Sequence, residues 1–453
     1  MTGPTIMKFG GTSVEDASAF DRVAGIVVEH VDRQPVVVVS AMSRVTDGLL
    51  ASVQTAAGKA DAAGALAALE VHFERHRAVA RSLLKTEATT AFESLLDRSR
   101  TEIADLLQTL ASRLMPRPPL QDVVVSYGER LAAALLAAVL RERGVAAQYV
   151  DARRCIVTDE EHGRAHPLLA ETSQRTREQL VPLIEAGTIP VLGGFIGAST
   201  DGATTTLGRG GSDYTAALVG AALDAREVQI WTDVNGVLTA DPRVVKEART
   251  IPRLSYAEAA ELAYFGAKVL HPKTIQPAVE RSIPVRICSS RAPAEPGTIV
   301  GAETEAAPRT VKSIAHKTGV TTVQITSARM LGAYGFLHAL FEVFNRHRTA
   351  VDVVTTSEVS VSLSLDDTSN LPSIIKELEQ LGTVQVEPNR AIICVVGEGL
   401  RGTPGIAARV FSTISDINVS LISQGASSIN LTFIVDEARA NETVARLHKA
   451  FFE

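Results

Sequence analysis

The sequence has 453 residues, which is more than one ordinary hydrophobic core can order, so we expect two or three domains. Hydrophobic residues make up 45% of the chain and charged residues 21%, as in a globular protein, and apolar runs such as Val36 to Val39 are too short to span a membrane. The net charge of −6 and the lack of a long basic run argue against nucleic acid as the main partner.

The first expected strand is a short apolar run that contains Lys8 and leads into Gly10, Gly11 and two hydroxyl residues. Glycines allow consecutive backbone N–H groups to converge on an anion, so this loop suits phosphate oxygens. Lys8 would then neutralise charge on a phosphoryl group. The other interpretation of Lys8 is an ordinary surface lysine at a strand end. The sequence contains no Walker A motif.

Short β-branched runs alternate with helical stretches over the first 290 residues. Each run ends in a small or polar residue, as expected where a buried parallel strand leads into its loop. Strands are expected at residues 35–40, 123–126, 189–194 and 228–233, and helices at 130–143, 175–186 and 213–223. The Ala- and Leu-rich residues 49–115 predict a helical insertion. The alternation predicts an α/β sandwich that binds its ligand at the carboxyl edge of the sheet.

A second glycine-rich turn lies at residues 206–214 and carries one cation, Arg209, and one carboxylate, Asp213. Its backbone N–H groups can also converge on an anion, and arginine binds carboxylates through two hydrogen bonds. Asp213 has a second explanation, because the helix dipole favours a carboxylate at the start of a helix. Together the two glycine-rich loops predict a phosphoryl-transfer site, where the protein positions its substrates and neutralises their charge.

The last third of the chain contains an internal repeat. Residues 335–341 align with residues 405–411, and the strands and helices expected in each copy follow the order β-α-β-β-α. This is the order of a ferredoxin-like unit. The first copy closes with a strand at residues 383–387, whereas the second has no residues left for one. We expect residues 311–317 to supply that strand, so that the first unit is inserted into the second.

The composition of residues 291–310, rich in proline, alanine and glutamate, predicts a linker before the repeat. The cysteines, Cys155, Cys288 and Cys394, are far apart and lie in or beside apolar runs. Buried reduced thiols in a cytoplasmic protein explain this pattern better than a disulfide or a metal site. We therefore expect no metal-ligand set in the protein.

Four motifs, in this order along the chain, resemble those of aspartate kinases, which belong to the amino acid kinase superfamily. They lie at residues 7–13, 126–129, 208–214 and 265–272. The C-terminal repeat resembles a tandem of ACT domains, the small regulatory domains that bind amino acids. The resemblance extends over essentially the whole chain, and the chain resembles the monofunctional, lysine-sensitive class of aspartate kinases.

The resemblance implies an α/β amino-acid-kinase sandwich followed by two ferredoxin-like (βαββαβ) ACT domains. The implied boundaries are residues 1–290 for the catalytic domain, 291–310 for the linker, 320–388 for the first ACT domain, and 311–319 plus 389–453 for the second. Pairing of ACT domains implies a homodimer or a larger homo-oligomer. We expect neither a nucleic acid nor a membrane as a partner.

The implied activity is ATP-dependent phosphorylation of the side-chain carboxylate of L-aspartate to 4-phospho-L-aspartate, the first step toward lysine, threonine and methionine. No general base is evident in the motifs. None is required, because a carboxylate with a pKa of about 3.9 is already ionised at neutral pH. Mg²⁺ should accompany ATP and be held mainly by the nucleotide phosphates and water.

The resemblance also implies roles for individual residues. Lys8 would stabilise the transferring phosphoryl group, and Asp213 would orient Lys8. Glu129 would bind the ammonium group of the amino acid, although a glutamate also suits the start of a helix. The expected substrate residues are Ser40, Thr46, Glu129, Arg209 and Ser212. The expected nucleotide residues are Lys8, Gly10, Gly11, Thr232, Asp233, Leu238, Arg243 and Lys268, of which Lys268 also suits a helix C-terminus.

An effector site is implied in the first ACT domain. Its expected residues are Met330, Tyr334, Gly335, Phe336, Leu337, Val351, Asp352, Thr356, Ser357 and Glu358. Asp352 and Glu358 are anionic and suit a cationic amino acid, so we expect lysine rather than threonine. The other interpretation is that these residues are ordinary loop polars of a ferredoxin-like unit.

Two alternative functions stay open on the sequence. One is another amino acid kinase, for example of the glutamate type; Glu129 disfavours N-acetylated substrates, which carry no ammonium group. The other is a catalytically inactive amino-acid sensor that uses only its ACT pair. The presence of Lys8, Arg209, Asp213 and Lys268 argues against an inactive protein.

Overall fold

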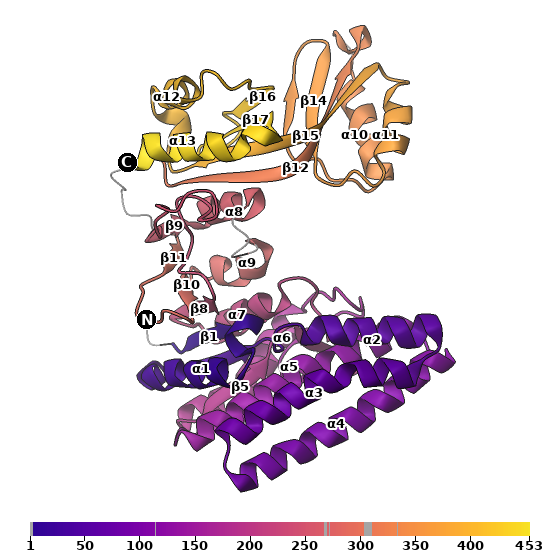
Figure 1. Ribbon diagram of the computed structural model, residues 1–453, viewed down its shortest axis with the longest axis vertical. Helices are drawn as coiled ribbons and strands as arrows, with labels where there is room; N and C mark the ends of the chain where they lie inside the picture. The colour runs from indigo at the N-terminus through magenta and orange to yellow at the C-terminus, as the bar shows by residue number, and fades with distance from the viewer. Residues whose placement is uncertain (1–2, 114, 267–269, 271, 303–309, 333) are drawn as a thin grey trace. The chain divides into compact units, whose positions relative to one another are not determined.

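The computed structural model describes residues 3–113, 115–266, 270, 272–302, 310–332 and 334–453. They form two compact units (Figure 1). The first contains the described parts of Met1–Val237, Pro252–Tyr256 and Leu270–Thr304, and the second those of Leu238–Ile251, Ala257–Val269 and Glu305–Glu453.

The first unit is built on an eight-stranded sheet of order β3-β5-β2-β1-β8-β10-β11-β9. Its strands are Thr5–Phe9 (β1), Pro35–Val39 (β2), Ala147–Val150 (β3), Ile189–Gly193 (β5), Glu227–Thr232 (β8), Arg253–Ser255 (β9), Val285–Ser289 (β10) and Thr298–Gly301 (β11). Neighbours are parallel except β10 and β11. Every residue of β1 and β2 is buried, as expected for central parallel strands. The strands predicted at 35–40, 189–194 and 228–233 are confirmed.

The remaining elements of this unit include a small sheet of order β4-β6-β7 and several helices. The small strands are Val157–Thr158 (β4), Ile196–Ser199 (β6) and Thr204–Thr206 (β7). The helices outside the insertion are Ala17–Glu29 (α1), Arg117–Glu142 (α5), Leu169–Glu185 (α6), Gly211–Ala222 (α7) and Pro272–Glu280 (α9). The sandwich predicted from the alternating pattern is thus observed.

Residues 123–126 do not form the predicted strand; they lie in α5. Prolines occupy the first turn of this helix, where a missing N–H costs nothing, and the helix then runs through a long apolar stretch to Leu140. Three consecutive valines fit a buried strand and a buried helix equally well. The apolar stretch that follows is longer than an ordinary strand, and this length favours the helix.

By length and composition α5 could also cross a bilayer, unlike the short apolar runs such as Val36 to Val39. The most apolar window of α5 is 89% buried inside the protein. Its side chains, among them Leu131, Leu135 and Leu140, belong to the main hydrophobic core of the unit. Burial in this core accounts for the apolar character of the helix.

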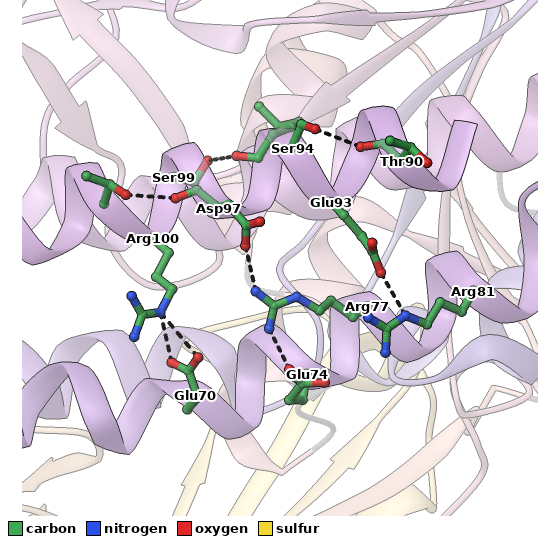
Figure 2. Close-up of polar contacts among 12 residues, drawn as sticks. Glu70, Glu74, Arg77, Arg81, Thr90, Glu93, Ser94, Asp97, Ser99 and Arg100 are labelled. Carbon is green, nitrogen blue, oxygen red and sulfur yellow. Dashed lines mark hydrogen bonds and ion pairs between the residues drawn. The ribbon is translucent and has the colours of Figure 1, made fainter. Parts of the chain in front are cut away.

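The predicted helical insertion is observed as Val45–Lys59 (α2), Ala62–Leu83 (α3) and Thr86–Ser112 (α4). Buried Phe73, Leu96 and Ile103 join these helices to the main core. Figure 2 shows ion pairs between α3 and α4 on the outer side: Arg77 lies 2.6 Å from Asp97, and Arg81 lies 2.7 Å from Glu93. Exposed ion pairs contribute at most about 1 kcal/mol each, so apolar packing holds the insertion together.

The second unit contains a six-stranded sheet of order β13-β14-β12-β15-β17-β16. Its strands are Ser313–Thr326 (β12), Val354–Thr356 (β13), Ser360–Leu365 (β14), Thr383–Val396 (β15), Leu421–Gln424 (β16) and Asn430–Asp436 (β17). The helices are Tyr256–Phe265 (α8, in this unit from Ala257 on), Phe336–Arg346 (α10), Leu371–Leu378 (α11), Ile406–Thr413 (α12) and Ala440–Phe452 (α13). Two separate hydrophobic cores correspond to the two repeats.

The long strands β12 and β15 each serve both repeats. Residues 313–317 of β12 pair with residues 392–396 of β15, next to β17 of the second repeat. Residues 321–326 of β12 pair with β14 of the first repeat on one side, and residues 322–326 pair with residues 383–387 of β15 on the other. The expected contribution of residues 311–317 to the second repeat is therefore observed for Ser313 to Lys317.

The segment expected as a linker, residues 291–310, contains one strand of the large sheet. β11 lies between β10 and β9 in that sheet. Proline and alanine dominate the composition before β11, so the four-residue strand Thr298–Gly301 could not be recognised from the sequence. Its pairing depends on β10 and β9, which are formed by other parts of the chain. The linker prediction is wrong for these four residues, and residues 303–309 lie outside the described part of the chain.

Candidate active site

A cavity of about 630 Å³ lies in the first unit, where β1 and β2 end and α7 begins. Eight residues predicted from the sequence line it, although they come from four separate regions of the chain, at residues 8–11, 40–46, 129 and 209–213. They are Lys8, Gly11, Ser40, Thr46, Glu129, Arg209, Ser212 and Asp213. This location matches the expected carboxyl edge of the sheet.

Lys8 and Asp213 form an ion pair in the lining of the cavity. The Nζ of Lys8 lies 2.7 Å from Oδ1 of Asp213, and their side chains are only 11% and 15% exposed. Lys8 is the fourth residue of a fully buried strand, so the interpretation as an ordinary surface lysine is wrong. Asp213 is the third residue of α7, where the helix dipole also favours its charge. The pair places one cation and one anion side by side beside the glycine-rich loops.

Both glycine-rich loops need glycine for a physical reason. A Cβ on Gly11 would lie 2.9 Å from the carbonyl oxygen of Ala41, which is too close for a side chain. Gly210, at the start of α7, has φ of 74°, a left-handed conformation that other residues rarely adopt. The loops can therefore approach a ligand more closely than loops that carry side chains.

Glu129 is a buried carboxylate that faces the cavity. It lies in the middle of α5, so the alternative explanation by a helix start is wrong. The side chain accepts a hydrogen bond from the backbone N–H of Ala41, and its Oε2 has no partner among the described residues. Burial raises the pKa of Glu129 to about 8, against a weaker opposing effect of that hydrogen bond. A buried carboxylate of this kind is stabilised by a cation, such as the ammonium group of an amino acid.

Arg209 lies exposed at the edge of the same cavity and forms no ion pair with any described residue. Its guanidinium is therefore available to a ligand carboxylate, which arginine binds through two parallel hydrogen bonds. Glu129 and Arg209 thus offer an anion and a cation to the same cavity, which suits an amino acid with both charges.

Sequence reasoning missed Asp122, a cavity residue that is 1% exposed. Its Oδ1 accepts a hydrogen bond from Thr206 Oγ1 at 2.7 Å, and its Oδ2 accepts one from the Gly163 N–H at 3.0 Å. Oδ2 also lies 2.9 Å from Nδ1 of His162. Asp122 precedes Glu129 by two turns of one helix, so the two face the same side. The seven-residue spacing of Asp122 and Glu129 could have indicated this, but residues 123–126 were predicted as a strand and not as part of a helix.

Comparison with known proteins decides the family. Residues 3–289 match the amino acid kinase family and residues 393–451 match the ACT domain. The chain is similar to the lysine-sensitive aspartokinase 3 of Escherichia coli strain K12, with 39% identity over 468 aligned positions that cover 100% of both chains. The chain belongs to the aspartokinases. It also shares 38% identity with the chloroplastic aspartokinase 1 of Arabidopsis thaliana, over 99% of this chain and 80% of that protein.

Solved aspartokinase structures have the same fold. The E. coli aspartokinase III complex with aspartate and ADP, an R-state structure, aligns with a TM-score of 0.84 at 39% identity over 99% of this chain and 100% of that one. The aspartate kinase of Clostridium acetobutylicum aligns equally well at 27% identity. The chain is therefore an aspartate kinase with ACT regulatory domains, and the glutamate-type and inactive-sensor alternatives are set aside.

The residues expected to bind nucleotide in this aspartokinase do not line the described cavity, apart from Lys8 and Gly11. Thr232 ends β8, and its carbonyl oxygen accepts hydrogen bonds from the N–H and hydroxyl of Ser290. Leu238 and Arg243 belong to the second unit, where Arg243 pairs with Asp241 at 2.6 Å. Lys268 lies outside the described residues. In the described part of the chain no cluster of three or more His, Cys, Asp or Glu side chains is arranged to hold a metal ion.

The residues expected to bind the effector lie in the first repeat of the aspartokinase tail. Thr356, Ser357 and Glu358 are exposed at the end of β13. Asp352 differs, because its side chain is only 1% exposed and lies 3.2 Å from Nζ of Lys317. The hydroxyl of Tyr264 also donates a hydrogen bond to Asp352. The carboxylate expected to bind a cationic amino acid thus already has two partners within the protein, which the sequence did not reveal.

Proposed function

We propose that this aspartokinase transfers the γ-phosphoryl group of ATP to the side-chain carboxylate of L-aspartate and so forms 4-phospho-L-aspartate. In this proposal Glu129 binds the α-ammonium group of aspartate and Arg209 its α-carboxylate. Hydroxyls that line the cavity orient the bound amino acid; they belong to Ser40, Thr46 and Ser212. The observation that carries the proposal is the buried Oε2 of Glu129, which has no partner among the described residues and lies in the same cavity as the Lys8–Asp213 pair.

The chemical step needs charge stabilisation rather than proton abstraction. The attacking carboxylate is already ionised at neutral pH, so no general base has to act. Lys8 stabilises the negative charge of the transferring phosphoryl group, and Asp213 fixes the direction of its ammonium group. The protein's remaining task is to hold two anions close together, which the glycine loops and Arg209 accomplish.

The nucleotide contacts are part of the same proposal. Gly10 and Gly11 approach the phosphates, and Thr232 and Asp233 contact the nucleoside. Leu238 borders the nucleotide as well, while Arg243 and Lys268 bind phosphate. Mg²⁺, held mainly by the nucleotide phosphates and water, adds positive charge at the transferring group when it is bound. The related E. coli aspartokinase III crystallised with ADP supports a nucleotide site in this fold.

We infer that lysine inhibits the enzyme through the first ACT domain, which we take as residues 320–388, with residues 311–319 and 389–453 as the second. The site comprises Met330, Tyr334, Gly335, Phe336, Leu337, Val351, Asp352, Thr356, Ser357 and Glu358. Two carboxylates in it, Asp352 and Glu358, suit the two ammonium groups of lysine better than the single one of threonine. The similar E. coli enzyme is named lysine-sensitive and was solved with lysine and aspartate in a T-state.

The same proposal includes the pathway, the oligomeric state and the cellular compartment of the enzyme. It catalyses the first step toward lysine, threonine and methionine, and it works as a homodimer or larger homo-oligomer that pairs through its ACT domains. The three cysteines are free and buried, as in a cytoplasmic protein.

The test is a turnover assay with ATP and L-aspartate in which hydroxylamine traps the acyl phosphate, with and without lysine. Hydroxamate that forms from aspartate and decreases when lysine is added supports substrate, reaction and effector together. Hydroxamate that lysine leaves unchanged retains the kinase reaction but contradicts lysine as the effector. Hydroxamate from glutamate and not from aspartate contradicts the substrate assignment.

A further inference from the structure

Helix α8 belongs to the sequence region that matches the kinase family, but from Ala257 on it packs within the unit that contains the ACT repeats. Three polar contacts hold it along one side. Glu258 pairs with Lys312 at 2.8 Å, with the two side chains 0% and 7% exposed. Glu261 accepts a hydrogen bond from the Asn430 side chain at 2.8 Å. These two contacts attach α8 to the second repeat, at the residue before β12 and at β17.

The third contact, from Tyr264, attaches α8 to the first repeat at the proposed effector site. The hydroxyl of Tyr264 donates a hydrogen bond to Oδ1 of Asp352. Residues 258, 261 and 264 recur at intervals of three, so they share one side of the helix. Asp352 is therefore a ligand-binding candidate and an anchor of α8 at the same time.

Lys317 completes the group around Asp352. Its Nζ lies 3.2 Å from Oδ2 of Asp352, 2.6 Å from Asp366, and 4.9 Å from the centre of the Tyr264 ring. Burial lowers the pKa of Lys317, but the hydrogen bonds and charges of Asp366 and Asp352 outweigh it and raise that pKa overall. Lys317 thus places a charged ammonium group where the ammonium group of an effector would have to bind.

The chain on either side of α8 leads into the catalytic unit. Before it, β9 is a strand of the eight-stranded sheet, and after it, α9 packs against α7. Thr274 of α9 lies so close to Gly210 that a Cβ on that glycine would be 2.7 Å from Thr274 Cγ2. Gly210 lies between Arg209 and Ser212 in the loop that lines the cavity. On the side of β9 the link is direct, because β9 ends at Ser255 and α8 begins at Tyr256, so a shift of α8 would act on a strand of the eight-stranded sheet.

We propose that Tyr264 is the positioning residue that couples effector binding at Asp352 to the catalytic unit through α8, and that Lys317 competes with the effector's ammonium group for the same carboxylate. The inference rests on the proposed effector site. A cation that binds the carboxylate of Asp352 must displace Lys317 or share the carboxylate with it. Either change alters the group that accepts the hydrogen bond from the Tyr264 hydroxyl. Binding energy at the effector site is thereby linked to the position of α8.

The test measures this linkage directly. The dissociation constant of lysine is determined by calorimetry on the full chain, with and without saturating aspartate and a non-hydrolysable ATP analogue. In wild type we expect the substrates to weaken lysine binding by about 5- to 150-fold, the usual range of allosteric coupling. Tyr264→Phe should reduce this factor to less than threefold, because it removes the hydroxyl and retains the ring. Tyr256→Phe is the matched control, since its hydroxyl in the same helix bonds to the Ile283 carbonyl instead.

Two results would overturn the inference alone: a Tyr264→Phe variant with the wild-type coupling factor, or a Tyr256→Phe variant that loses coupling equally. A second variant tests Lys317 independently. Lys317→Gln should tighten lysine binding severalfold, and unchanged or weaker binding would show that Lys317 is no competitor. A wild-type protein that makes hydroxamate from aspartate but does not bind lysine would overturn the proposed effector and this inference together. This result differs from the two above, in which lysine binds and only the role of Tyr264 fails.

Discussion

The Nζ of Lys8 lies 2.7 Å from Oδ1 of Asp213, although one residue belongs to the first strand of the chain and the other to a helix that begins at Gly211. Each of the two charges is largely buried, and each is stabilised by the other. The pair supplies a fixed positive group at the end of β1, where the ligand cavity begins. A strand and a helix far apart in sequence therefore meet at one cavity.

Replacing Lys8 by methionine should lower kcat by about 10²- to 10³-fold, as does the loss of one group that stabilises transition-state charge in other enzymes. The side chain keeps its length and loses its charge, so packing in β1 is retained. KM for aspartate should change much less than kcat. Steady-state hydroxamate kinetics measure both, and a variant with wild-type kcat would contradict the role of Lys8.

Asp213→Asn should also lower kcat, because it no longer fixes the ammonium group of Lys8. If Asp213 acts only through Lys8, the double variant Lys8→Met, Asp213→Asn should be no slower than Lys8→Met alone. The measurement is a double-mutant cycle on kcat. Fully additive losses would show that Asp213 has a separate role.

Glu129 should make aspartate binding depend on pH. Its pKa is about 8 because it is buried, so in the free enzyme it is largely protonated below that pH. Only the carboxylate pairs with an ammonium group, so kcat/KM for aspartate should rise as pH increases from 6 and level off above about 8. Glu129→Gln should lower kcat/KM about 10- to 100-fold and flatten this pH profile. A wild-type profile that is flat in this range would contradict the assignment.

Ionisation of Glu129 should lower the stability of the folded protein without substrate, whereas it should strengthen aspartate binding. Its pKa is raised from 4.5 to about 8 in the folded protein, so the folded state holds the proton more tightly than the unfolded chain. The resulting stabilisation is present below pH 4.5 and is lost as pH rises through 8. Glu129→Gln should therefore raise Tm relative to wild type more at pH 8.5 than at pH 5. Thermal unfolding at the two pH values, without substrate, measures the difference.

Asp122 should affect the substrate site although no motif includes it. Its carboxylate accepts hydrogen bonds from β7 and from the loop at Gly163, and β7 leads into the loop that carries Arg209. Asp122→Ala leaves buried donors without a partner and loosens that loop, so KM for aspartate should rise about tenfold. Thr206→Val, which removes only one of the donors, should have a smaller effect. Equal effects of both variants would contradict the positioning role.

Much of the fold follows from patterns within short stretches of sequence. Strands such as Pro35–Val39 are short, β-branched and fully buried, which is the pattern typical of central parallel strands. α5 was missed because its first turns contain three consecutive valines, which suit a strand as well as a helix. β11 was missed because its four residues become a strand only through pairing with β10 and β9. Local patterns do not contain that information.

The site residues also divide into those that local sequence patterns indicate and those that depend on tertiary structure. Lys8, Glu129 and Arg209 stand in motifs that could be recognised, and the fold brings them into one cavity. The partners of Asp352 could not be predicted, because Lys317 and Tyr264 are separated from it by 35 and 88 positions and belong to different elements. Only tertiary structure shows that a carboxylate expected to be open to a ligand is already paired.

The pairing of Asp352 leads to different expectations for the two acidic residues of the proposed effector site. Glu358 is exposed, and its loss should simply remove one contact to lysine. Glu358→Ala should therefore raise the inhibitory lysine concentration at least tenfold while the uninhibited rate and Tm stay near wild type. Asp352→Ala should raise it as much, but it also deprives Tyr264 and Lys317 of a partner, so Tm should fall. Inhibition curves and thermal unfolding of both variants check this. Two variants with wild-type sensitivity to lysine would show that the effector binds elsewhere.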